Sequence, residues 1–209
     1  MKTEQQEFWL SQFGKDYLQR NLTRDDFNKL YKDQTGFDVE KPFLDFFSDL
    51  DREIEILEFG CNVGLKLEIL KKMGFKNLTG IDINSEALKI AKINNPDINF
   101  YDKTLSDFKL IGKKFDLVFT SLVLIHQSPS TINSVISEII DVSNEYIFGY
   151  EYFNDDLTEI EYRGNSNVLW KQNYIKLYTN LNANLKVIKQ IKYEYTDGNN
   201  SDIGFLIKK

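Results

Sequence analysis

The chain contains one cysteine, Cys61, and one histidine, His126, among its 209 residues. A single thiol cannot form an internal disulfide, which favours a reducing compartment. One cysteine and one histidine also cannot supply the ligand cluster of a structural zinc site. We therefore expect no bound metal.

Long apolar stretches and basic runs are also missing. No stretch of about 18 apolar residues occurs, so we expect no segment to insert into a membrane. The first residues, MKTEQQEFW, lack the apolar core of a secretion signal, and we predict a cytoplasmic protein. The formal net charge is −6 and the charges alternate in sign along the chain. A nucleic-acid partner usually binds a basic face, so this class of partner is disfavoured.

Enough apolar residues are present to build a core. Hydrophobic residues make up 42% of the chain and aromatic residues 14%, which argues against disorder. The length fits one domain. We predict a single domain over residues 1–209, with a helical cap at residues 1–50 and an α/β core at residues 51–209, present as a monomer or a homodimer.

Strand and helix patterns alternate through the core. Helical spacing is found at residues 4–31 and 43–50, and helices are also predicted at residues 169–181 and after Ser128 and Pro129. Strands are predicted at residues 54–59, 78–83, 98–101, 115–120, 146–150, 185–195 and 203–208. Strand–helix alternation predicts a mostly parallel, Rossmann-like seven-stranded sheet with helices on both faces. The short turn at residues 197–200 makes the last strand antiparallel.

The segment IEILEFGCNVG at residues 54–64 carries the strongest functional signal. A buried strand followed by a glycine-bearing turn and a helix presents backbone N–H groups to a ligand. Gly60 permits a sharp turn with no Cβ facing that ligand. The middle glycine of the dinucleotide fingerprint G-x-G-x-x-G is replaced by Asn62, which disfavours a pyrophosphate. A tight turn without a ligand is the alternative. The residues assigned here to cofactor binding are Glu58, Gly60, Cys61, Asn62 and Gly64.

An acidic residue, Asp82, ends the second predicted strand, roughly 20 residues beyond the glycines. Its carboxylate can accept hydrogen bonds from both hydroxyls of a ribose. Helix capping is the alternative role, but Asn84 can already fill it. NAD and S-adenosylmethionine (SAM) both carry a ribose diol. Asp82 and the following Ile83 therefore indicate an adenosyl cofactor without choosing between these two.

Later loops add further candidates. We expect Thr104 and Leu105 beside the adenine, with an ordinary loop as the alternative. Ser121 ends the fourth predicted strand, at the edge where α/β sheets bind ligands. His126 follows the same strand. A lone histidine is more often structural, but this position makes His126 our first candidate for a general base.

The fifth predicted strand leads into EYFNDDLTEIEYRG at residues 151–164. Glu151 is our second candidate for a base. We assign four further residues to binding a second substrate, the acceptor: Tyr152, Asn154, Tyr162 and Arg163. The guanidinium of Arg163 can bind a carboxylate or a phosphate, with a surface ion pair as the alternative.

Taken together, these motifs resemble class I SAM-dependent methyltransferases and, more narrowly, the pseudaminic acid biosynthesis-associated methylase family. The resemblance is carried by EFWLSQFGKDYLQRN (residues 7–21), LEFGCNVGLKLEIL (57–70), KFDLVFTSLVLIH (114–126), EYFN (151–154) and EIEYRG (159–164). Two departures lie near the expected acceptor site. The family has a proline after the Asn of EYFN, and a Lys-Gly pair where this chain has Ser121 and Leu122.

The resemblance implies SAM as cofactor, S-adenosylhomocysteine as product, and transfer of the methyl group to an O or N atom of a small polar acceptor. The implied acceptor is a sugar, a nonulosonic acid or a nucleotide-sugar of surface glycan biosynthesis. Two residues on the cap are expected to close over the site: Tyr17, which we assign to catalysis, and Arg20, which we assign to binding the acceptor. The alternatives are a nicotinamide-dependent oxidoreductase, a non-catalytic SAM-binding regulator, and a methyltransferase acting on a protein, a lipid-linked glycan or another small metabolite.

Overall fold

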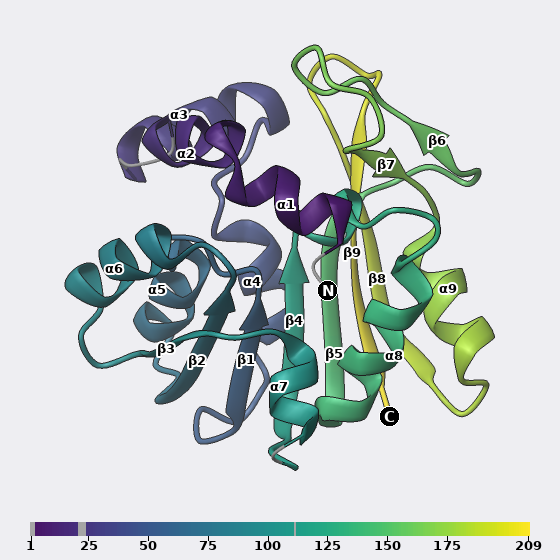
Figure 1. The fold of residues 1–209 in the computed structure, drawn as a ribbon. Coiled ribbons are helices and arrows are strands. Elements are labelled where there is room, and N and C mark those ends of the chain that lie inside the picture. Colours follow the sequence, from purple (N-terminus) through teal and green to yellow (C-terminus); the bar gives the residue numbers. More distant parts are fainter. Residues whose placement is uncertain (1–2, 21–23, 111) are drawn as a thin grey trace. The chain divides into compact units, whose positions relative to one another are not determined.

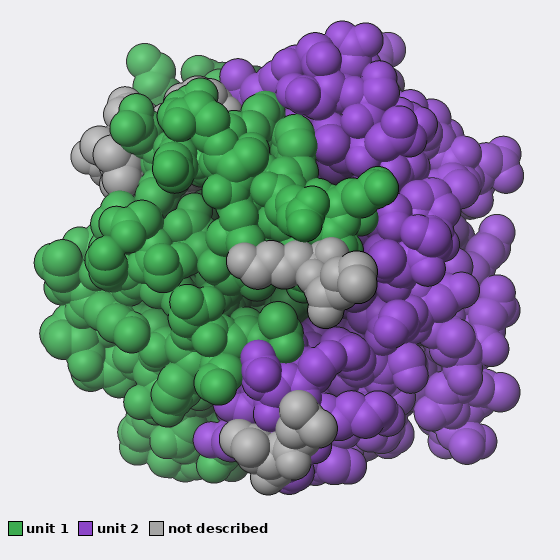
Figure 2. Space-filling view, in the orientation of Figure 1, with its two compact units in different colours: residues 1–104 green, residues 105–209 purple. Residues whose placement is uncertain are grey.

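The computed structural model describes residues 3–20, 24–110 and 112–209. The chain divides into two compact units, residues 1–104 (unit 1) and residues 105–209 (unit 2), which have different colours in Figure 2. Each unit is described by itself below. The expected single domain over residues 1–209 stays a prediction.

Unit 1 begins with four helices, as the apolar spacing predicts: α1 (Glu4–Leu10), α2 (Gln12–Arg20), α3 (Arg24–Thr35) and α4 (Lys41–Phe47). Thr3 starts α1 with a capping box, in which its side chain accepts the N–H of Gln6 and the Gln6 side chain accepts the N–H of Thr3. Aromatic rings join α1 to α2, and the ring centroids of Trp9 and Tyr17 lie 5.1 Å apart, edge to face.

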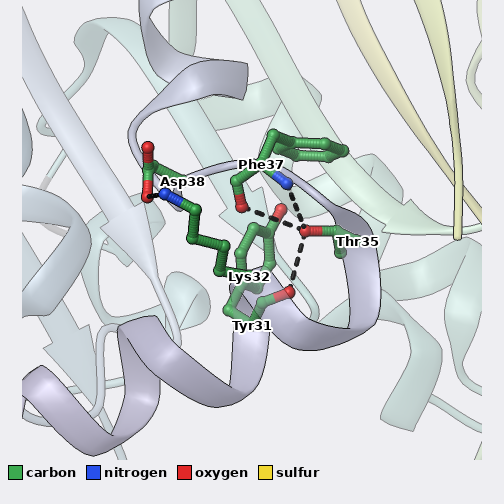
Figure 3. A network of polar contacts seen from close by, with 5 residues as sticks. All are labelled: Tyr31, Lys32, Thr35, Phe37 and Asp38. Atoms are coloured by element: carbon green, nitrogen blue, oxygen red, sulfur yellow. Dashed lines mark hydrogen bonds and ion pairs between the residues drawn. The ribbon is translucent and has the colours of Figure 1, made fainter. Parts of the chain in front are cut away.

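A small polar network fixes the end of α3, as Figure 3 shows. The buried Thr35 hydroxyl lies 2.8 Å from the carbonyl of Tyr31 and 3.1 Å from that of Phe37. It also accepts the N–H of Phe37 at 3.4 Å. An ion pair of 3.0 Å joins Lys32 to Asp38. These contacts tie the last turn of α3 to the segment that leads into α4.

The α/β part of unit 1 follows with β1 (Glu55–Phe59), α5 (Leu65–Lys72), β2 (Asn77–Asp82), α6 (Ser85–Asn94) and β3 (Asn99–Asp102). The strand β2 pairs in parallel with both β1 and β3. Both α5 and α6 contact β2, and α6 also contacts β3 (Figure 1). Because the strands are parallel, the turn after β1 and the residues after β2 lie at the same edge of the sheet.

Unit 2 contains α7 (Leu105–Leu110), β4 (Phe115–Ser121), the 3₁₀ turn η1 (Leu124–His126), α8 (Ile132–Val142), β5 (Ser143–Tyr152), β6 (Thr158–Glu159), β7 (Trp170–Lys171), α9 (Tyr174–Leu181), β8 (Lys186–Glu194) and β9 (Ser201–Lys208). The strands β4 and β5 are parallel, and β9 runs antiparallel to both β5 and β8. Figure 1 shows α8 along β4 and β5, and α8 contacts α7 and α9 as well.

The strand topology is that of a seven-stranded sheet in the order β3-β2-β1-β4-β5-β9-β8, in which β9 runs antiparallel to both of its neighbours. The predicted fold class, Rossmann-like and mostly parallel with an antiparallel last strand, is confirmed. None of the helices in the described ranges is long and apolar enough to span a membrane.

Two predicted boundaries are wrong. The helix predicted at residues 169–181 starts only at Tyr174, because β7 precedes it and pairs with β6. Ser128 and Pro129 do not open α8, which starts at Ile132. The Ser128 hydroxyl instead lies 2.9 Å from that of Thr131, in a turn where the Ser128 carbonyl accepts the N–H of Ile132.

Candidate functional site

In unit 1, the glycine turn (residues 60–64) connects β1 to α5. The backbone takes left-handed φ angles at alternate positions, 75° at Gly60, 48° at Asn62 and 79° at Gly64. Glycine adopts this region without cost and asparagine tolerates it. The N–H groups of Gly60 and Cys61 donate to the carbonyl of Ile81 at 2.9 and 3.0 Å. The turn is therefore fixed to β2 by its first two amides.

Close packing holds the glycine turn from beneath. A Cβ built on Gly64 would lie 2.8 Å from the Phe100 ring, and one built on Gly80 would lie 2.7 Å from the Cys61 sulfur. Neither position has room for a larger residue. Cys61 is itself buried, and burial raises the pKa of its thiol well above the usual value. A buried neutral thiol is a poor nucleophile, which agrees with the assignment of Cys61 to the turn.

Asp82 connects the glycine turn to the start of α6. One carboxylate oxygen accepts the N–H of Asn62 and the other accepts the N–H of Asn84, both at 2.8 Å. Asn84 caps α6 with its own side chain, as predicted, by accepting the N–H groups of Glu86 and Ala87. Burial raises the pKa of Asp82. A carboxylate oxygen has two lone pairs, so each can still accept a ligand hydroxyl.

The neighbouring carboxyl group, on Glu58 at the end of β1, is fully buried. Neither of its oxygens has a hydrogen-bond partner among the described residues. Burial raises the pKa of Glu58 to about 8, and the charge of Asp82 adds to this rise. The charge of Lys66 and the backbone N–H of Leu67, which does not meet hydrogen-bond geometry, oppose it. An unpartnered buried carboxyl group costs stability unless a donor satisfies it. This side of the glycine turn can therefore accept a cationic, hydrogen-bonding group of a ligand.

The other predicted cofactor residues lie at strand ends. Ile83 follows β2 and is half-buried, and Ser121 ends β4 in unit 2. Thr104 is the last residue of unit 1 and Leu105 the first of unit 2, so their joint contact with an adenine stays a prediction. On the cap, Tyr17 is half-buried on α2, and the side chain of Arg20 lies outside the described part of the structure.

In unit 2, the turn between β4 and η1 is held by β5. Leu122 has a left-handed φ of 57°, and its N–H donates to the carbonyl of Tyr150 at 2.8 Å. The Glu151 carboxylate accepts the N–H groups of Val123 at 3.0 Å and Ile125 at 3.4 Å. Glu151 is fully buried, and burial raises its pKa to about 7.

The half-buried ring of His126 ends η1. Its Nδ1 lies 2.8 Å from the carbonyl oxygen of Val168. A carbonyl only accepts hydrogen bonds, so Nδ1 carries the proton and Nε2 is the basic nitrogen of the neutral ring. Burial lowers the pKa of His126 to about 4, against the hydrogen bond to Val168. The ring is therefore neutral at pH 7. No sequence pattern points to Val168, because a backbone carbonyl belongs to every residue.

A tight hairpin brings Tyr162 and Arg163 to this ring. The centroids of the His126 and Tyr162 rings lie 5.7 Å apart, and the Arg163 guanidinium carbon lies 5.8 Å from the Tyr162 centroid. Arg163 and Gly164 have φ angles of 52° and 76°, and Tyr162 and Asn165 exchange backbone hydrogen bonds. This is a two-residue turn of type I′, which favours Asn and Gly. We call His126, Tyr162 and Arg163 the His–Tyr–Arg row.

Tyr152 is the last residue of β5, and Asn154 follows two residues later. The Tyr152 ring packs edge to face on Tyr195 at 6.2 Å, and the Lys171 ammonium lies 5.5 Å from its centroid. Burial raises the pKa of Tyr152 to about 12, and the smaller contributions include the charges of Asp202 and Tyr162. Asn154 donates to the Thr158 hydroxyl at 2.7 Å. The roles of Lys171, Tyr195 and Asp202 were not predicted, because their strands come together only in the fold.

The described residues contain no group of three or more His, Cys, Asp or Glu side chains arranged to hold a metal ion. The chemistry available in unit 1 is an unpartnered acid beside a rigid turn. Unit 2 offers a neutral imidazole, a phenol and a guanidinium in a row.

Residues 56–145 match the model of a methyltransferase domain family. The matched segment includes Glu58, the glycine turn, Asp82 and His126, and it ends before Glu151 and the hairpin. A putative protein N5-glutamine methyltransferase of Methanocaldococcus jannaschii is 37% identical over 68 residues, 31% of this chain and 34% of that protein. An uncharacterized methyltransferase of Synechocystis is 31% identical over 85 residues, 41% of this chain and 40% of that protein. The chain thus spans well under half the length of these curated relatives.

Solved structures share the fold along the chain. The N-methyltransferase NodS of Bradyrhizobium japonicum, in complex with S-adenosylhomocysteine, has a TM-score of 0.68 at 18% identity, covering 93% of this chain and 97% of that one. The magnesium protoporphyrin IX methyltransferase of Synechocystis with bound SAM has a TM-score of 0.69 at 14% identity, covering 100% and 98%. The fold is therefore that of methyltransferases.

Proposed function

We propose that this protein is a SAM-dependent methyltransferase. The observation that carries the proposal is the fully buried, unpartnered carboxyl group of Glu58 beside the glycine turn. Both features lie inside the segment that matches the methyltransferase domain. A ligand with an ammonium group at one end and a ribose at the other has a partner for each end in unit 1.

The residues at the edge of unit 1 fit SAM. Glu58 would hold the methionine ammonium, and the Asp82 oxygens would hold the ribose hydroxyls beside the backbone amides they already bind. Of the unit 1 residues, Ile83 and Thr104 would contact the adenosyl group, and Tyr17 and Arg20 would close over it. When bound, SAM supplies a methyl group activated by a sulfonium leaving group, so the protein needs alignment more than acid chemistry.

The acceptor is a small polar molecule that is methylated on O or N. The Nε2 atom of His126 takes the proton from the acceptor, because the hydrogen bond to Val168 leaves this nitrogen as the base. Tyr162 supplies an aromatic wall next to this base. Tyr152 and Asn154, at and just after the end of β5, would complete the polar surroundings. In this scheme, Glu151 is no longer a base, because the protein buries its carboxylate and engages it with two backbone amides.

A carboxylate or phosphate on the acceptor is favoured by Arg163. Its guanidinium is exposed and lies over Tyr162 at the tip of the hairpin. We propose a nonulosonic acid, a nucleotide-sugar or a related glycan precursor as the acceptor class. The narrow resemblance at residues 151–154 and 159–164 supports this choice, and the chemistry of Arg163 agrees with it.

Two measurements test the proposal. Calorimetry with SAM and S-adenosylhomocysteine should show binding of both at micromolar concentrations. Incubation with methyl-labelled SAM and a metabolite extract, followed by mass spectrometry, should give a labelled acidic sugar derivative. A protein that binds neither adenosyl compound is not a SAM-dependent enzyme. A protein that binds both but labels only other proteins would keep the chemistry and lose the proposed acceptor class.

A further inference from the structure

The Glu151 carboxylate reaches across from β5 to the backbone that begins η1. Its oxygens accept the N–H groups of Val123 and Ile125. The first N–H groups of a helical turn have no partner within the turn, so a carboxylate there satisfies donors that would otherwise be buried and unpaired. The η1 turn contacts β5 and β7. Glu151 is therefore a cap supplied by a neighbouring strand.

The same turn is held a second time, through the side chain of its last residue. The His126 Nδ1 donates to the carbonyl of Val168, two residues before β7. The hydrogen bonds from Glu151 fix the backbone of η1, and the hydrogen bond to Val168 fixes the imidazole ring. A ring whose backbone and side chain are both held keeps one tautomer and one direction for Nε2.

We propose that Glu151 is a positioning residue, which holds η1 through the amides of Val123 and Ile125 so that His126 presents Nε2 to the acceptor. This inference rests on the proposed function for the catalytic role of His126. The link between Glu151 and the imidazole itself does not depend on that role. In this role Glu151 does not accept the proton itself, and instead supports His126, which does.

The surroundings of Glu151 supply a matched control. The hydroxyl of Tyr178 is fully buried near this carboxylate and has no partner among the described residues. Tyr178→Phe removes a buried polar atom that interacts electrostatically with Glu151 but leaves the bonds to Val123 and Ile125 in place. Glu151→Gln keeps the volume of the side chain. Its carbonyl oxygen, in the place of Oε2, could still accept the N–H groups of both Val123 and Ile125. The test variant is therefore Glu151→Met, which has a similar size and no acceptor oxygen.

The single histidine makes the test direct. Nitrogen-15 NMR of the imidazole needs no assignment, because only one ring is present. In the wild-type protein we expect one tautomer, with the proton on Nδ1, and an ionisation midpoint far below the usual range. In Glu151→Met we expect signals averaged between the two tautomers and a midpoint at least one pH unit higher. Tyr178→Phe should keep the wild-type spectrum.

Turnover gives the second measurement. A displaced base costs about tenfold or more in kcat, so Glu151→Met should show this loss with KM and SAM affinity within about twofold of wild type. Wild-type-like imidazole signals in Glu151→Met would overturn the proposal, whatever the turnover. If the Met variant does not fold, Glu151→Asp, with the same charge on a shorter side chain, must shift the ring signals for the proposal to stand. Failure to find any acceptor would sink the proposed function and leave the spectroscopic test intact.

Discussion

The unpartnered carboxyl group of Glu58 predicts a specific dependence of SAM binding on pH. With a pKa of about 8, Glu58 is mostly protonated at pH 7 in the free protein. An ammonium group binds the ionised form, so ionising Glu58 costs about 1.4 kcal/mol for each pH unit below 8. SAM affinity should therefore rise about tenfold from pH 6 to 7, and about two- to threefold from pH 7 to 8, where the ligand's own amino group begins to lose its charge.

Above pH 8 the affinity should fall again. The α-amino group of the ligand loses its charge there, because its ordinary pKa is about 7.7–8.0. The wild-type curve is therefore a bell with a maximum near that range. The rise on its acid side belongs to the protein and the fall on its alkaline side belongs to the ligand.

Glu58→Gln separates these two limbs. The amide can accept a hydrogen bond but carries no charge, so at pH 8 the variant should bind SAM about 1.5–3 kcal/mol more weakly. At pH 6, ionising Glu58 costs the wild-type protein about 2.7 kcal/mol, so the SAM affinities of the wild type and the variant should converge. The acid limb should be absent from the variant.

Isothermal titration calorimetry from pH 6 to 9 measures these affinities. Buffers of different ionisation enthalpy should also show release of about 0.9 proton at pH 7 from the wild-type protein. Glu55→Gln, the same change at the exposed start of β1, is the matched control and should follow the wild-type curve. A flat affinity between pH 6 and 8, or a Glu58→Gln curve parallel to the wild-type curve, would refute the assignment of Glu58.

Three further predictions concern single residues. Asp82→Ala should weaken SAM binding by about 1.5–3 kcal/mol and also lower the melting temperature, because it leaves the amides of Asn62 and Asn84 without their acceptor; wild-type affinity in calorimetry would contradict the ribose assignment. His126→Asn should lower kcat about 10²–10⁴-fold with SAM affinity unchanged, and the acid limb of the wild-type kcat profile should lie near pH 4 rather than 6.5, because burial disfavours the charged ring; unchanged turnover on the true acceptor would remove the base. Arg163→Gly should stabilise the fold by up to about 1 kcal/mol by relieving a positive φ, yet raise KM for an anionic acceptor about tenfold; thermal unfolding and steady-state kinetics check the two effects, and an unchanged KM would leave Arg163 as a surface residue.

The parts of the site that sequence predicts are those set by local chemistry. Gly60 and Gly64 mark the turn because left-handed φ angles favour glycine, and both have such angles. Asn84 caps α6 because a short polar side chain before an amphipathic helix accepts its first amides. The alternation of strands and helices predicts the class of fold, because it too can be recognised from local sequence patterns. The cofactor assignments themselves remain predictions about chemistry.

The parts that sequence does not predict come from contacts between distant segments. Trp170 and Lys171 form a strand only because β6 lies beside them, and helical spacing alone favours the wrong structure there. The burial of Glu151 follows from its place on β5, opposite Ile203 of β9, and an acid at a strand end gives no sign of it. The spacing of Asp82 predicts that it binds a ribose. Its hydrogen bonds to the amides of Asn62 and Asn84 give it a structural role as well, which spacing cannot reveal.

The packing under the glycine turn has a consequence for how the protein meets its ligand. Phe100 packs closely against Gly64, and the Cys61 sulfur packs closely against Gly80, so the loop is tightly held on this side. A tightly held loop loses little conformational entropy when a ligand binds, so ordering this loop costs little binding free energy. Crystal structures determined with and without a bound nucleoside should superimpose at this loop. Any conformational entropy lost on binding should come from other parts of the chain.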